Sequence, residues 1–367
     1  MKIVIITATF YPRISPRPMR ATELAKYFAS QGHEVIVYSV YGKYDYSNFI
    51  RETGIILKPL PLKYAPINSD GTDIRTTFNK VLGRLFGYLL EFPYIEYMWK
   101  IPKILKKEGQ IDLLITNAVP YPIHWGAARA KSILKSNFPK VWISDCGDPY
   151  MGNSVLKHPF YFKYLEHYWG ERTDYITIPI EEARSAYLSH VQNKIRIIPQ
   201  GFSFDNIKLC SPIRPHQVPT FAYAGAVYKG YRDPTNFLNF LCTLNIDFKF
   251  IIYTSDFSFY EPFKAKLKDK LELKKYIPRN QLLYELSSMD FLINLLNMKS
   301  VQSPSKLIDY FLTKRPILDV STNFVEAKSF NEFLEGNYSH CHIQPDIEKY
   351  NICNVGDSFL TLAKKHI

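Results

Sequence analysis

Two loops in the second half of the sequence combine glycine or serine with cationic side chains, as phosphate-binding loops do. The first loop starts at Gly225, directly after an apolar segment, and carries Lys229 and Arg232. Glycine allows a ligand to approach the backbone closely, and the two cations can neutralise an anionic ligand. Asp233 and Pro234 then have the order expected at the start of a helix. The loop therefore predicts an anion-binding site at a strand end.

The second loop places Ser303, Ser305 and Lys306 at the expected start of a helix, with Asp309 about one turn further on. The first N–H groups of a helix lack intrahelical partners and attract anions. A lysine in this first turn opposes the helix dipole, and a bound anion would offset that cost. Together the two loops predict a diphosphate cradle with a carboxylate placed for a sugar hydroxyl. Each loop alone is also consistent with ordinary helix capping.

In the first half, the loop after the first apolar segment is rigid and basic. It contains three prolines together with Arg13, Arg17 and Arg20, which are candidates to bind an anionic acceptor; a solvated basic loop is the alternative. The loop lacks the glycines of a GxGxxG motif, and the chain lacks a Walker motif. Dehydrogenase and P-loop functions are therefore not expected.

Three further residues of the first half are candidates for the reaction. Asp145 and Asp148 follow a predicted strand, and either carboxylate could accept the proton of an attacking hydroxyl. Capping of a turn is the alternative for both. His124 follows a Pro-Tyr-Pro segment and is a candidate acceptor ligand, with a packed histidine as the alternative. The chain has no DxD motif, so no metal is expected.

Alternating strand and helix patterns must position these loops. In the first half, apolar runs predict strands at 2–8, 34–39, 112–116, 140–145, 174–180 and 194–199, and helical spacing predicts helices at 19–31, 123–134 and 181–190. Beyond a proline-rich linker at 211–219, the pattern repeats with strands at 220–224, 248–254, 290–296 and 316–320 and helices at 234–241, 260–271, 279–289 and 304–312. This alternation is typical of α/β domains with parallel sheets, which bind ligands at the carboxyl ends of their strands.

Composition narrows the class of protein. The chain has 367 residues, 46% hydrophobic and 22% charged, which fits two ordered domains. Five separated cysteines without a CxxC pair argue against a disulfide scaffold or zinc ribbon and fit the cytoplasm. The short apolar start does not predict a signal peptide, and the segment 81–99 carries too many charges to predict a membrane span.

The net charge of +12 is distributed unevenly. Residues 1–200 hold 26 Lys/Arg against 17 Asp/Glu, and the remainder hold 20 against 17. The charge is scattered and no nucleic-acid-binding motif occurs, so nucleic acid is not an expected partner. Within 58–140, 13 basic and 6 acidic residues are interleaved with aromatic ones, which suits peripheral contact with an anionic membrane, on its inner face. A solvated face over a buried aromatic helix is the alternative.

Over nearly its whole length the chain resembles the family 4 glycosyltransferases of the GT-B fold. The resemblance rests on the segments 10–20, Glu23-Leu24-Ala25, Gly32-His33-Glu34-Val35, Ile198-Pro199-Gln200-Gly201, Tyr223-Ala224-Gly225, Arg232-Asp233-Pro234, Ile277-Pro278-Arg279-Asn280-Gln281-Leu282 and Pro304-Ser305-Lys306-Leu307-Ile308-Asp309-Tyr310. It implies two Rossmann-like domains facing each other across a cleft. The acceptor-binding domain is expected at 1–200, the nucleotide-sugar-binding domain at 201–350, and a C-terminal helix at 351–367 is expected to pack back towards the first domain.

The residues and the resemblance together define three predicted sets. The donor-binding set is Gly225, Lys229, Arg232, Ile277, Pro278, Ser303, Ser305, Lys306, Leu307 and Asp309. The acceptor-binding set is Arg13, Arg17, Arg20 and His124, and the catalytic set is Asp145, Asp148, Arg232 and Lys306. The family implies transfer of a sugar with retention from a nucleotide-diphosphate donor, without a cofactor. The acceptor implied is a lipid-linked saccharide in bacterial capsule, O-antigen or exopolysaccharide synthesis.

Two departures from the family pattern stand out. Ser15-Pro16-Arg17 replaces a glycine pair in the first loop, and Val301 stands where the first of two glutamates is usual. Asp309 is then left to bind the ribose. The altered glutamate motif keeps open a non-catalytic, nucleotide-sugar-binding subunit of the same fold, whereas the intact cationic loops favour an enzyme.

Overall fold

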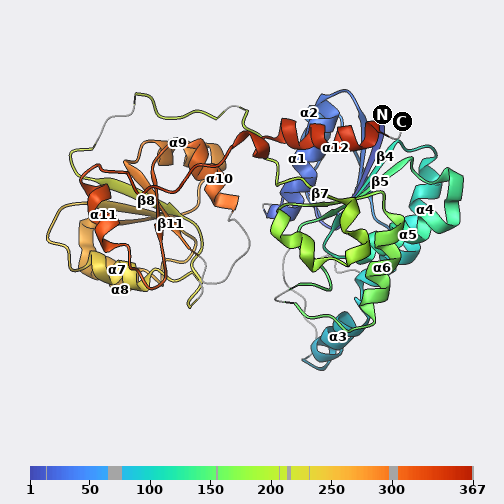
Figure 1. Cartoon of the computed structure of the whole chain (residues 1–367), viewed down its shortest axis with the longest axis horizontal. Helices are drawn as coiled ribbons and strands as arrows, with labels where there is room; N and C mark the ends of the chain where they lie inside the picture. The colour runs from blue at the N-terminus through green and yellow to red at the C-terminus, as the bar shows by residue number, and fades with distance from the viewer. Residues whose placement is uncertain are drawn as a thin grey trace. The chain divides into compact units, whose positions relative to one another are not determined.

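The computed structural model describes residues 1–13, 15–64, 77–153, 156–205, 207–212, 216–230, 232–296 and 305–365 (Figure 1). The chain divides into two compact units: unit 1 is Met1–Ser203 with Lys349–Ile367, and unit 2 is Phe204–Glu348. Each unit is built around one parallel sheet with helices packed on it. The prediction of an α/β fold with two parallel sheets is confirmed.

Unit 1 contains a seven-stranded sheet in the order β3-β2-β1-β4-β5-β6-β7. Its strands are β1 (Lys2–Thr7), β2 (Glu34–Ser39), β3 (Ile56–Pro59), β4 (Leu113–Ala118), β5 (Val141–Cys146), β6 (Tyr175–Ile178) and β7 (Ile195–Ile197). All neighbouring strands pair in parallel. The strand order reverses between β1 and β4, which is where sheets of this kind bind ligands at the carboxyl ends.

Helices cover both faces of this sheet. They are α1 (Pro16–Ser30), α2 (Ser47–Thr53), α3 (Thr77–Leu90), α4 (Tyr97–Glu108), α5 (Pro122–Leu134), α6 (Phe162–Arg172) and α12 (Ile352–Lys364). Successive residues of a strand point to opposite faces. Val4 and Ile6 of β1 therefore join the apolar cluster of α4, α5 and α6, whereas Ile3 and Ile5 join that of α1, α2 and α12. Burial on both faces explains why the strands are continuous apolar runs.

The C-terminal helix α12 belongs to unit 1, where it packs against α1 (Figure 1). The Tyr27 hydroxyl of α1 donates a hydrogen bond to Asp357 Oδ1 at 2.6 Å. At Gly356 an added Cβ would lie 2.1 Å from Tyr27 Cδ1, so the two helices approach closely only because this residue has no side chain. The contact holds the end of the chain on unit 1.

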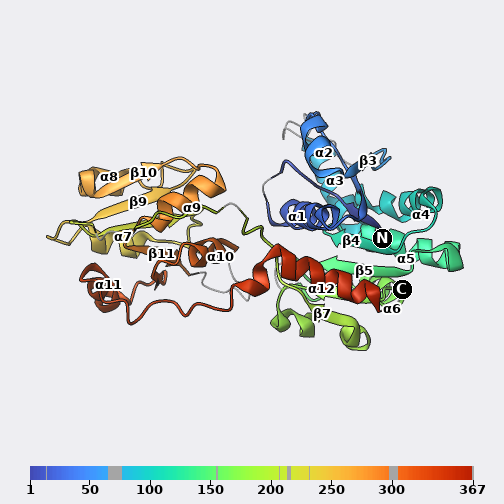
Figure 2. The ribbon, with the colours of Figure 1, turned by 90° about the horizontal axis from the view of Figure 1, so that it is seen from above.

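Unit 2 contains a five-stranded parallel sheet in the order β10-β9-β8-β11-β12, with β10 at one edge (Figure 2). Its strands are β8 (Thr220–Ala224), β9 (Lys249–Tyr253), β10 (Leu271–Lys274), β11 (Phe291–Leu295) and β12 (Ile317–Val320). Its helices are α7 (Thr235–Leu241), α8 (Glu261–Leu267), α9 (Arg279–Ser287), α10 (Ser305–Leu312) and α11 (Ala327–Leu334). Stacked phenylalanines fill one face; the Phe221 ring lies 4.7 Å from that of Phe250 and 4.8 Å from that of Phe291. The opposite face packs α9 and α10.

Two predicted helices differ from the structure. The segment 181–190 forms two 3-10 helices, η3 (Glu181–Ala186) and η4 (Ser189–Lys194), because Tyr187 is extended and turns its ring into the core. The segment 260–271 is helical only to Leu267 in α8 and a short 3-10 turn, and Leu271 begins β10. In both places tertiary packing outweighs the helical spacing of the sequence. Among the described residues, no helix is long and apolar enough to cross a membrane.

Candidate functional site

The carboxyl end of β8 and the first turn of α10 meet in unit 2. Tyr310 of α10 fixes this junction, because its hydroxyl accepts a hydrogen bond from the Ala224 N–H at 2.7 Å and lies 3.3 Å from the Ala224 carbonyl. Gly225 follows with φ +154°, and an added Cβ would lie 3.0 Å from Tyr223 Oη and 3.6 Å from Lys306 Cδ. The positive φ and the close approach of Tyr223 Oη favour glycine at this position, whereas the distance to Lys306 Cδ is an ordinary contact.

Lys306 is a buried cation at this junction. Its Nζ atom lies 4.3 Å from the centroid of the Tyr223 ring and has no hydrogen-bond partner within the described part of the chain. Burial, together with the positive charge of Arg232, holds the pKa of Lys306 well below its usual value, although Asp319 opposes this shift. A buried ammonium without hydrogen bonds is costly, and an anionic ligand would satisfy it.

Arg232 reaches the same junction from a tight turn. Tyr228 and Arg232 exchange backbone hydrogen bonds of 3.0 and 2.8 Å, which places Lys229 at the exposed tip of the turn. Asp233 holds the turn by accepting from the Gly230 N–H at 3.1 Å, and it also accepts from the N–H of the first residue of α7 at 3.0 Å. The helix thus begins one residue later than predicted, after Pro234, and the cationic loop is preformed.

Asp309 already has a cationic partner. Nε and Nη2 of Arg279 both lie 2.8 Å from Asp309 Oδ1. Burial raises the pKa of the Asp309 carboxyl, and the Arg279 guanidinium opposes this shift. Arg279 is the first residue of α9, so the pair brings the preceding Ile277 and Pro278 next to α10. The sequence analysis did not assign Arg279 to the site, although this arginine lies in the segment that carries the family resemblance.

Other members of the predicted donor set contribute in different ways. The Leu307 side chain is only 5% exposed and packs in the apolar cluster of α10, so its assignment to the donor-binding set stays a prediction. Ser303 lies outside the described residues, and Ser305 is described only as the first residue of α10. Asp319 of β12, which the sequence analysis also did not assign, accepts from Asn294 Nδ2 at 2.6 Å and lies 2.6 Å from His342 Nδ1. Asp319 could have been noticed in the sequence, because it is a charged residue within a strand predicted to be buried.

In unit 1, Arg20 and Asp145 form a buried pair, 6% and 0% exposed. Arg20 Nε and Nη2 each lie 2.7 Å from one carboxylate oxygen, and Arg20 also donates to two carbonyls after β7. Asn117 Nδ2 and Thr177 Oγ1 donate to the same carboxylate at 2.7 Å. Burial alone would raise the pKa of Asp145, but Arg20 and these donors lower it. Asp145 and Arg20 pair with each other and with core groups, which favours a structural role for both. Their assignments as a base and as an acceptor ligand stay predictions.

His124 also lies in the core of unit 1. It is fully buried, its Nδ1 lies 2.7 Å from Thr116 Oγ1, and its Nε2 lies 3.4 Å from Cys146 Sγ. Burial lowers the pKa of His124 to about 3, against the opposing charge of Asp145. A neutral histidine with both ring nitrogens engaged in the core favours the alternative, a packed histidine, and the role of His124 as an acceptor ligand stays a prediction.

Two arginines and one aspartate of the predicted unit 1 sets remain at the surface. Arg17 lies in the first turn of α1 and Asp148 follows β5, and Arg17 Nη2 lies 3.1 Å from Asp148 Oδ2. Tyr121 fixes the loop after β5 by donating its hydroxyl hydrogen to the Asp148 carbonyl at 2.5 Å. Arg13 is exposed on the loop after β1. These three residues therefore lie near the carboxyl ends of the strands, where unit 1 is expected to bind a ligand.

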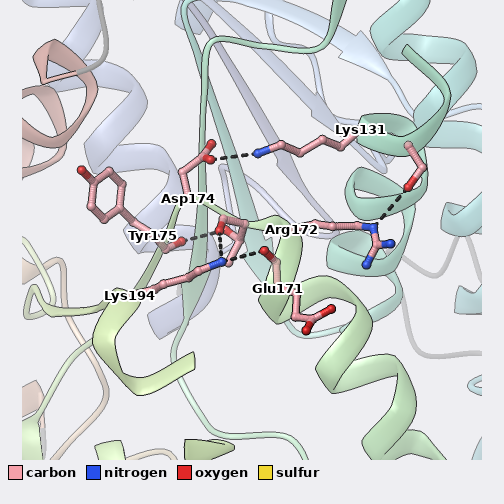
Figure 3. A pocket seen from close by; sticks show the side chains of 8 residues that line it. Lys131, Glu171, Arg172, Asp174, Tyr175 and Lys194 are labelled. Carbon is pink, nitrogen blue, oxygen red and sulfur yellow. Dashed lines mark hydrogen bonds and ion pairs between the residues drawn. The ribbon is translucent and has the colours of Figure 1, made fainter. Parts of the chain in front are cut away.

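A pocket of about 460 Å³ opens at the opposite, amino-end edge of the unit 1 sheet (Figure 3). Its cationic groups already have partners: Lys131 Nζ lies 2.8 Å from Asp174 Oδ1, and Lys194 Nζ donates to three backbone carbonyls at 2.6–3.1 Å. Arg172 donates to Ser132 Oγ at 3.2 Å. Cations that are already partnered offer little to an anionic substrate, so we do not assign the reaction to this pocket.

An apolar surface links α3 to the start of α6; we call it the α3–α6 patch. Its exposed members are Leu85, Phe86, Tyr88, Leu89, Leu90, Phe92, Leu156, Phe160, Tyr161 and Tyr164. The Tyr161 hydroxyl donates to the Leu89 carbonyl at 2.5 Å, which joins the two segments. Arg84, Lys157 and Lys163 are exposed within the same segments. The alternative of a buried aromatic helix is wrong for the described side chains of α3, because five apolar ones from Leu85 to Leu90 face solvent.

Comparisons with known proteins agree with this architecture. The sequence model of Glycosyltransferase Family 4 matches residues 19–206, slightly more than half of the chain. No curated protein matches the sequence. A solved glycosyltransferase from Rickettsia africae ESF-5 is 15% identical, with a TM-score of 0.61 over 99% of this chain and 96% of that one.

Two other structures match 100% of both chains. The lipopolysaccharide outer core galactosyltransferase WaaB, in its apo form, is 12% identical with a TM-score of 0.62. Alr3699/HepE from Anabaena, in complex with UDP and glucose, is 8% identical with a TM-score of 0.60. At such identities the likeness shows the fold alone, which is the GT-B fold. By the match of its sequence, the chain belongs to Glycosyltransferase Family 4.

Proposed function

We propose that the protein transfers a sugar, with retention, from a nucleoside-diphosphate sugar bound by unit 2 to a lipid-linked saccharide bound by unit 1. The observation that carries the proposal is the buried Lys306 ammonium, which lacks a hydrogen-bond partner among the described residues and has Arg232 beside it. A diphosphate is the ligand class that fits two cations at a strand end. Solved relatives of the fold in complex with UDP and with UDP-glucose support a nucleotide sugar as donor.

In this mechanism, Lys306 and Arg232 stabilise the charge that develops on the departing diphosphate. Preorganised donors of this kind act most strongly where water is excluded, and the loss of one typically costs about 10²–10³ in rate. The backbone N–H groups at the start of α10 add a further anion site. Retention rests on membership of the family, for which the sequence resemblance implies it. Because both carboxylate oxygens of Asp145 already accept hydrogen bonds from the core, we assign binding of the acceptor saccharide to Arg17, Arg13 and Asp148.

A thermal-shift screen of nucleotide sugars, followed by measurement of nucleoside diphosphate release, tests the proposal. At 100 times its dissociation constant, a bound donor adds about 2.7 kcal/mol to the free energy of unfolding. The enzyme should then release diphosphate slowly by hydrolysis and faster with an acceptor. Binding without any turnover would favour the alternative, a non-catalytic nucleotide-sugar-binding subunit. The absence of a shift with every nucleotide sugar would contradict both.

We propose that transfer needs no divalent metal, since Lys306 and Arg232 can supply the positive charge that a metal would otherwise supply to the departing diphosphate. The expected result is an unchanged rate of diphosphate release in excess EDTA. The check compares initial rates in EDTA, in Mg²⁺ and in Mn²⁺. A rate that disappears in EDTA and returns with Mg²⁺ would overturn this part of the proposal.

We further propose that unit 1 contacts an anionic membrane through the α3–α6 patch, as an enzyme of bacterial surface polysaccharide synthesis would at the inner face. The neighbouring basic residues each contribute about 1 kcal/mol near such a surface, and the apolar side chains insert between headgroups. The match to a lipopolysaccharide galactosyltransferase supports this setting.

The protein should therefore sediment with anionic liposomes at low salt and be released at high salt. The double substitution Phe86→Ser and Phe160→Ser removes two exposed rings and should weaken sedimentation at least about fivefold, since each ring contributes apolar burial of order 1 kcal/mol. Ile343→Ser, which removes an even more exposed apolar side chain of unit 2, is the control and should bind as the wild type does. Equal binding of the double variant and the wild type to the liposomes would contradict membrane contact through the α3–α6 patch.

A further inference from the structure

Two histidines and a glutamate gather on the solvent face of α6 and η4 in unit 1. His167 and Glu171 are four residues apart and therefore lie on one face of α6, while His190 comes from η4. His167 Nδ1 lies 2.8 Å from His190 Nε2, and His167 Nε2 lies 3.2 Å from Glu171 Oε1. One ligand atom from each of the three residues lies within 4.8 Å of the others. The proposed reaction uses none of these side chains.

The two elements that carry the cluster are held firmly together. At Gly170 of α6 an added Cβ would lie 2.9 Å from Val191 Cγ1, so the helix and η4 approach as closely as a glycine permits. Val191 is buried next to His190. Lys194, at the end of η4, donates to the carbonyls of Gly170, Glu171 and Thr173 at 2.6–3.1 Å and thereby closes the end of α6. Ligands on rigid, packed elements lose little entropy on binding a metal.

The Glu171 carboxylate is available for a cation although several basic groups are near. In Figure 3 the dashed lines from Lys131 and Arg172 run to Asp174 and Ser132, not to Glu171. Lys194 bonds to the backbone carbonyl of Glu171 and not to its carboxylate. The carboxylate itself pairs with His167. Two imidazoles and a carboxylate form a donor set that suits Zn²⁺ and, among other divalent ions, Co²⁺ and Ni²⁺.

We propose that His167, Glu171 and His190 bind one Zn²⁺ ion, with solvent completing the coordination. A tetrahedral zinc ion keeps such ligand atoms about 3.3 Å apart, so the histidine pair must open by roughly 0.5 Å and the carboxylate must turn inwards. All three side chains are exposed and have room for this adjustment. The ion crosslinks α6 to η4 at the amino-end edge of the unit 1 sheet. Its role is structural, because Arg17 and Asp148 lie near the opposite, carboxyl-end edge.

Titration calorimetry of the full chain with Zn²⁺ alone tests the site. The background carries Cys341→Ser and Cys353→Ser, since these exposed thiols are competing zinc ligands. We expect one saturable equivalent, which His190→Ala weakens at least about tenfold, because loss of a direct ligand exceeds the 10–100-fold effect of losing an outer partner. Glu171→Gln should weaken binding in the same way. Zinc should also raise the unfolding temperature of the background protein but not that of the His190→Ala variant.

The pair His340 and Glu332 provides the matched control. The exposed His340 and the partly exposed Glu332 lie 2.7 Å apart but lack a third ligand among the described residues, so His340→Ala should leave the isotherm unchanged. An unchanged isotherm for His190→Ala, or no saturable binding by the background protein, would overturn the proposal. The readout is metal binding itself, so it does not depend on whether the protein transfers a sugar.

Discussion

Replacing Lys306 by methionine should abolish nucleotide-sugar binding while leaving the free protein at least as stable as the wild type. Methionine keeps the length of the side chain and its packing on the Tyr223 ring. It removes a buried charge that has no hydrogen-bond partner within the described residues. The cation–π attraction that the substitution removes is worth at most about 2 kcal/mol, less than the typical cost of an unsatisfied buried ammonium. The rate of diphosphate release should fall by about 10²–10³ or more.

The measurements are the unfolding temperature with and without nucleotide sugar, together with the initial rate. A lysine that only supports the fold would give the opposite result, a loss of stability on substitution. Lys274→Met is the matched control in unit 2: Lys274 Nζ lies 3.2 Å from Glu285 Oε2, so its loss should slightly destabilise the protein without affecting the rate. A stable Lys306→Met variant that still shows the full nucleotide-induced shift would refute the diphosphate assignment.

The stability difference between Lys306→Met and the wild type should depend on pH in a definite direction. The pKa of Lys306 is lower in the folded protein than in the unfolded chain, so the unfolded state binds more protons between these two values. The stability of the wild type therefore rises as pH approaches the ordinary lysine pKa of about 10.4. The stability advantage of Lys306→Met should accordingly shrink as pH rises towards 10, as measured by denaturant unfolding of both proteins.

Replacing Asp145 by asparagine should destabilise unit 1 by about 3–5 kcal/mol, because it leaves Arg20 as an uncompensated buried charge. Asparagine also places an amide N–H₂ where the carboxylate accepted hydrogen bonds from Thr177 or Asn117. Urea unfolding at pH 7 measures the effect. Asp148→Asn is the matched control, since its exposed pair with Arg17 should contribute less than about 1 kcal/mol.

The direction in which the stabilising effect of Asp145 changes with pH also follows from its pKa. The pKa of Asp145 is lowered in the folded protein, so its stabilising contribution is present above the unfolded value of about 3.9 and is lost as pH falls through the folded pKa. The difference between wild type and Asp145→Asn should therefore diminish in acid. Equal stability of the two proteins at pH 7 would show that Asp145 is not the buried anchor described here, and would reopen its assignment as a catalytic base.

Much of the fold follows from local patterns. Buried parallel strands are continuous apolar runs, and their alternation with helices predicted two α/β sheets correctly. Some elements were not predicted at all, among them β3, α4 and α6. Others were misassigned because their sequence is ambiguous. β10 has the sequence Leu-Glu-Leu-Lys, whose alternation also suits the end of a helix, and only pairing with β9 makes it a strand. Tyr187 likewise ends a predicted helix because its ring is buried in unit 1.

Part of the candidate site could likewise be predicted from the sequence, and part could not. Gly225, Arg232 and Lys306 could be singled out from the sequence because two loops that combine small residues with cations follow strands of the same domain, although each loop alone also suits helix capping. Charge type alone cannot show which groups pair with one another. Asp145 and Asp148 look equivalent in the sequence, yet one is saturated in the core and the other lies at the surface.

The sequence by itself determined the class of fold, the family and the two cationic loops, since these depend on the order of neighbouring residues. Only the tertiary structure decided that Arg20, Asp145 and His124 belong to the core. It also decided that the ammonium nitrogen of Lys306 is buried without a hydrogen-bond partner among the described residues. The partners of Asp145 lie 125, 28 and 32 residues away in the chain. Contacts over such separations are set by how the strands are ordered in the sheet, and no local pattern encodes that order.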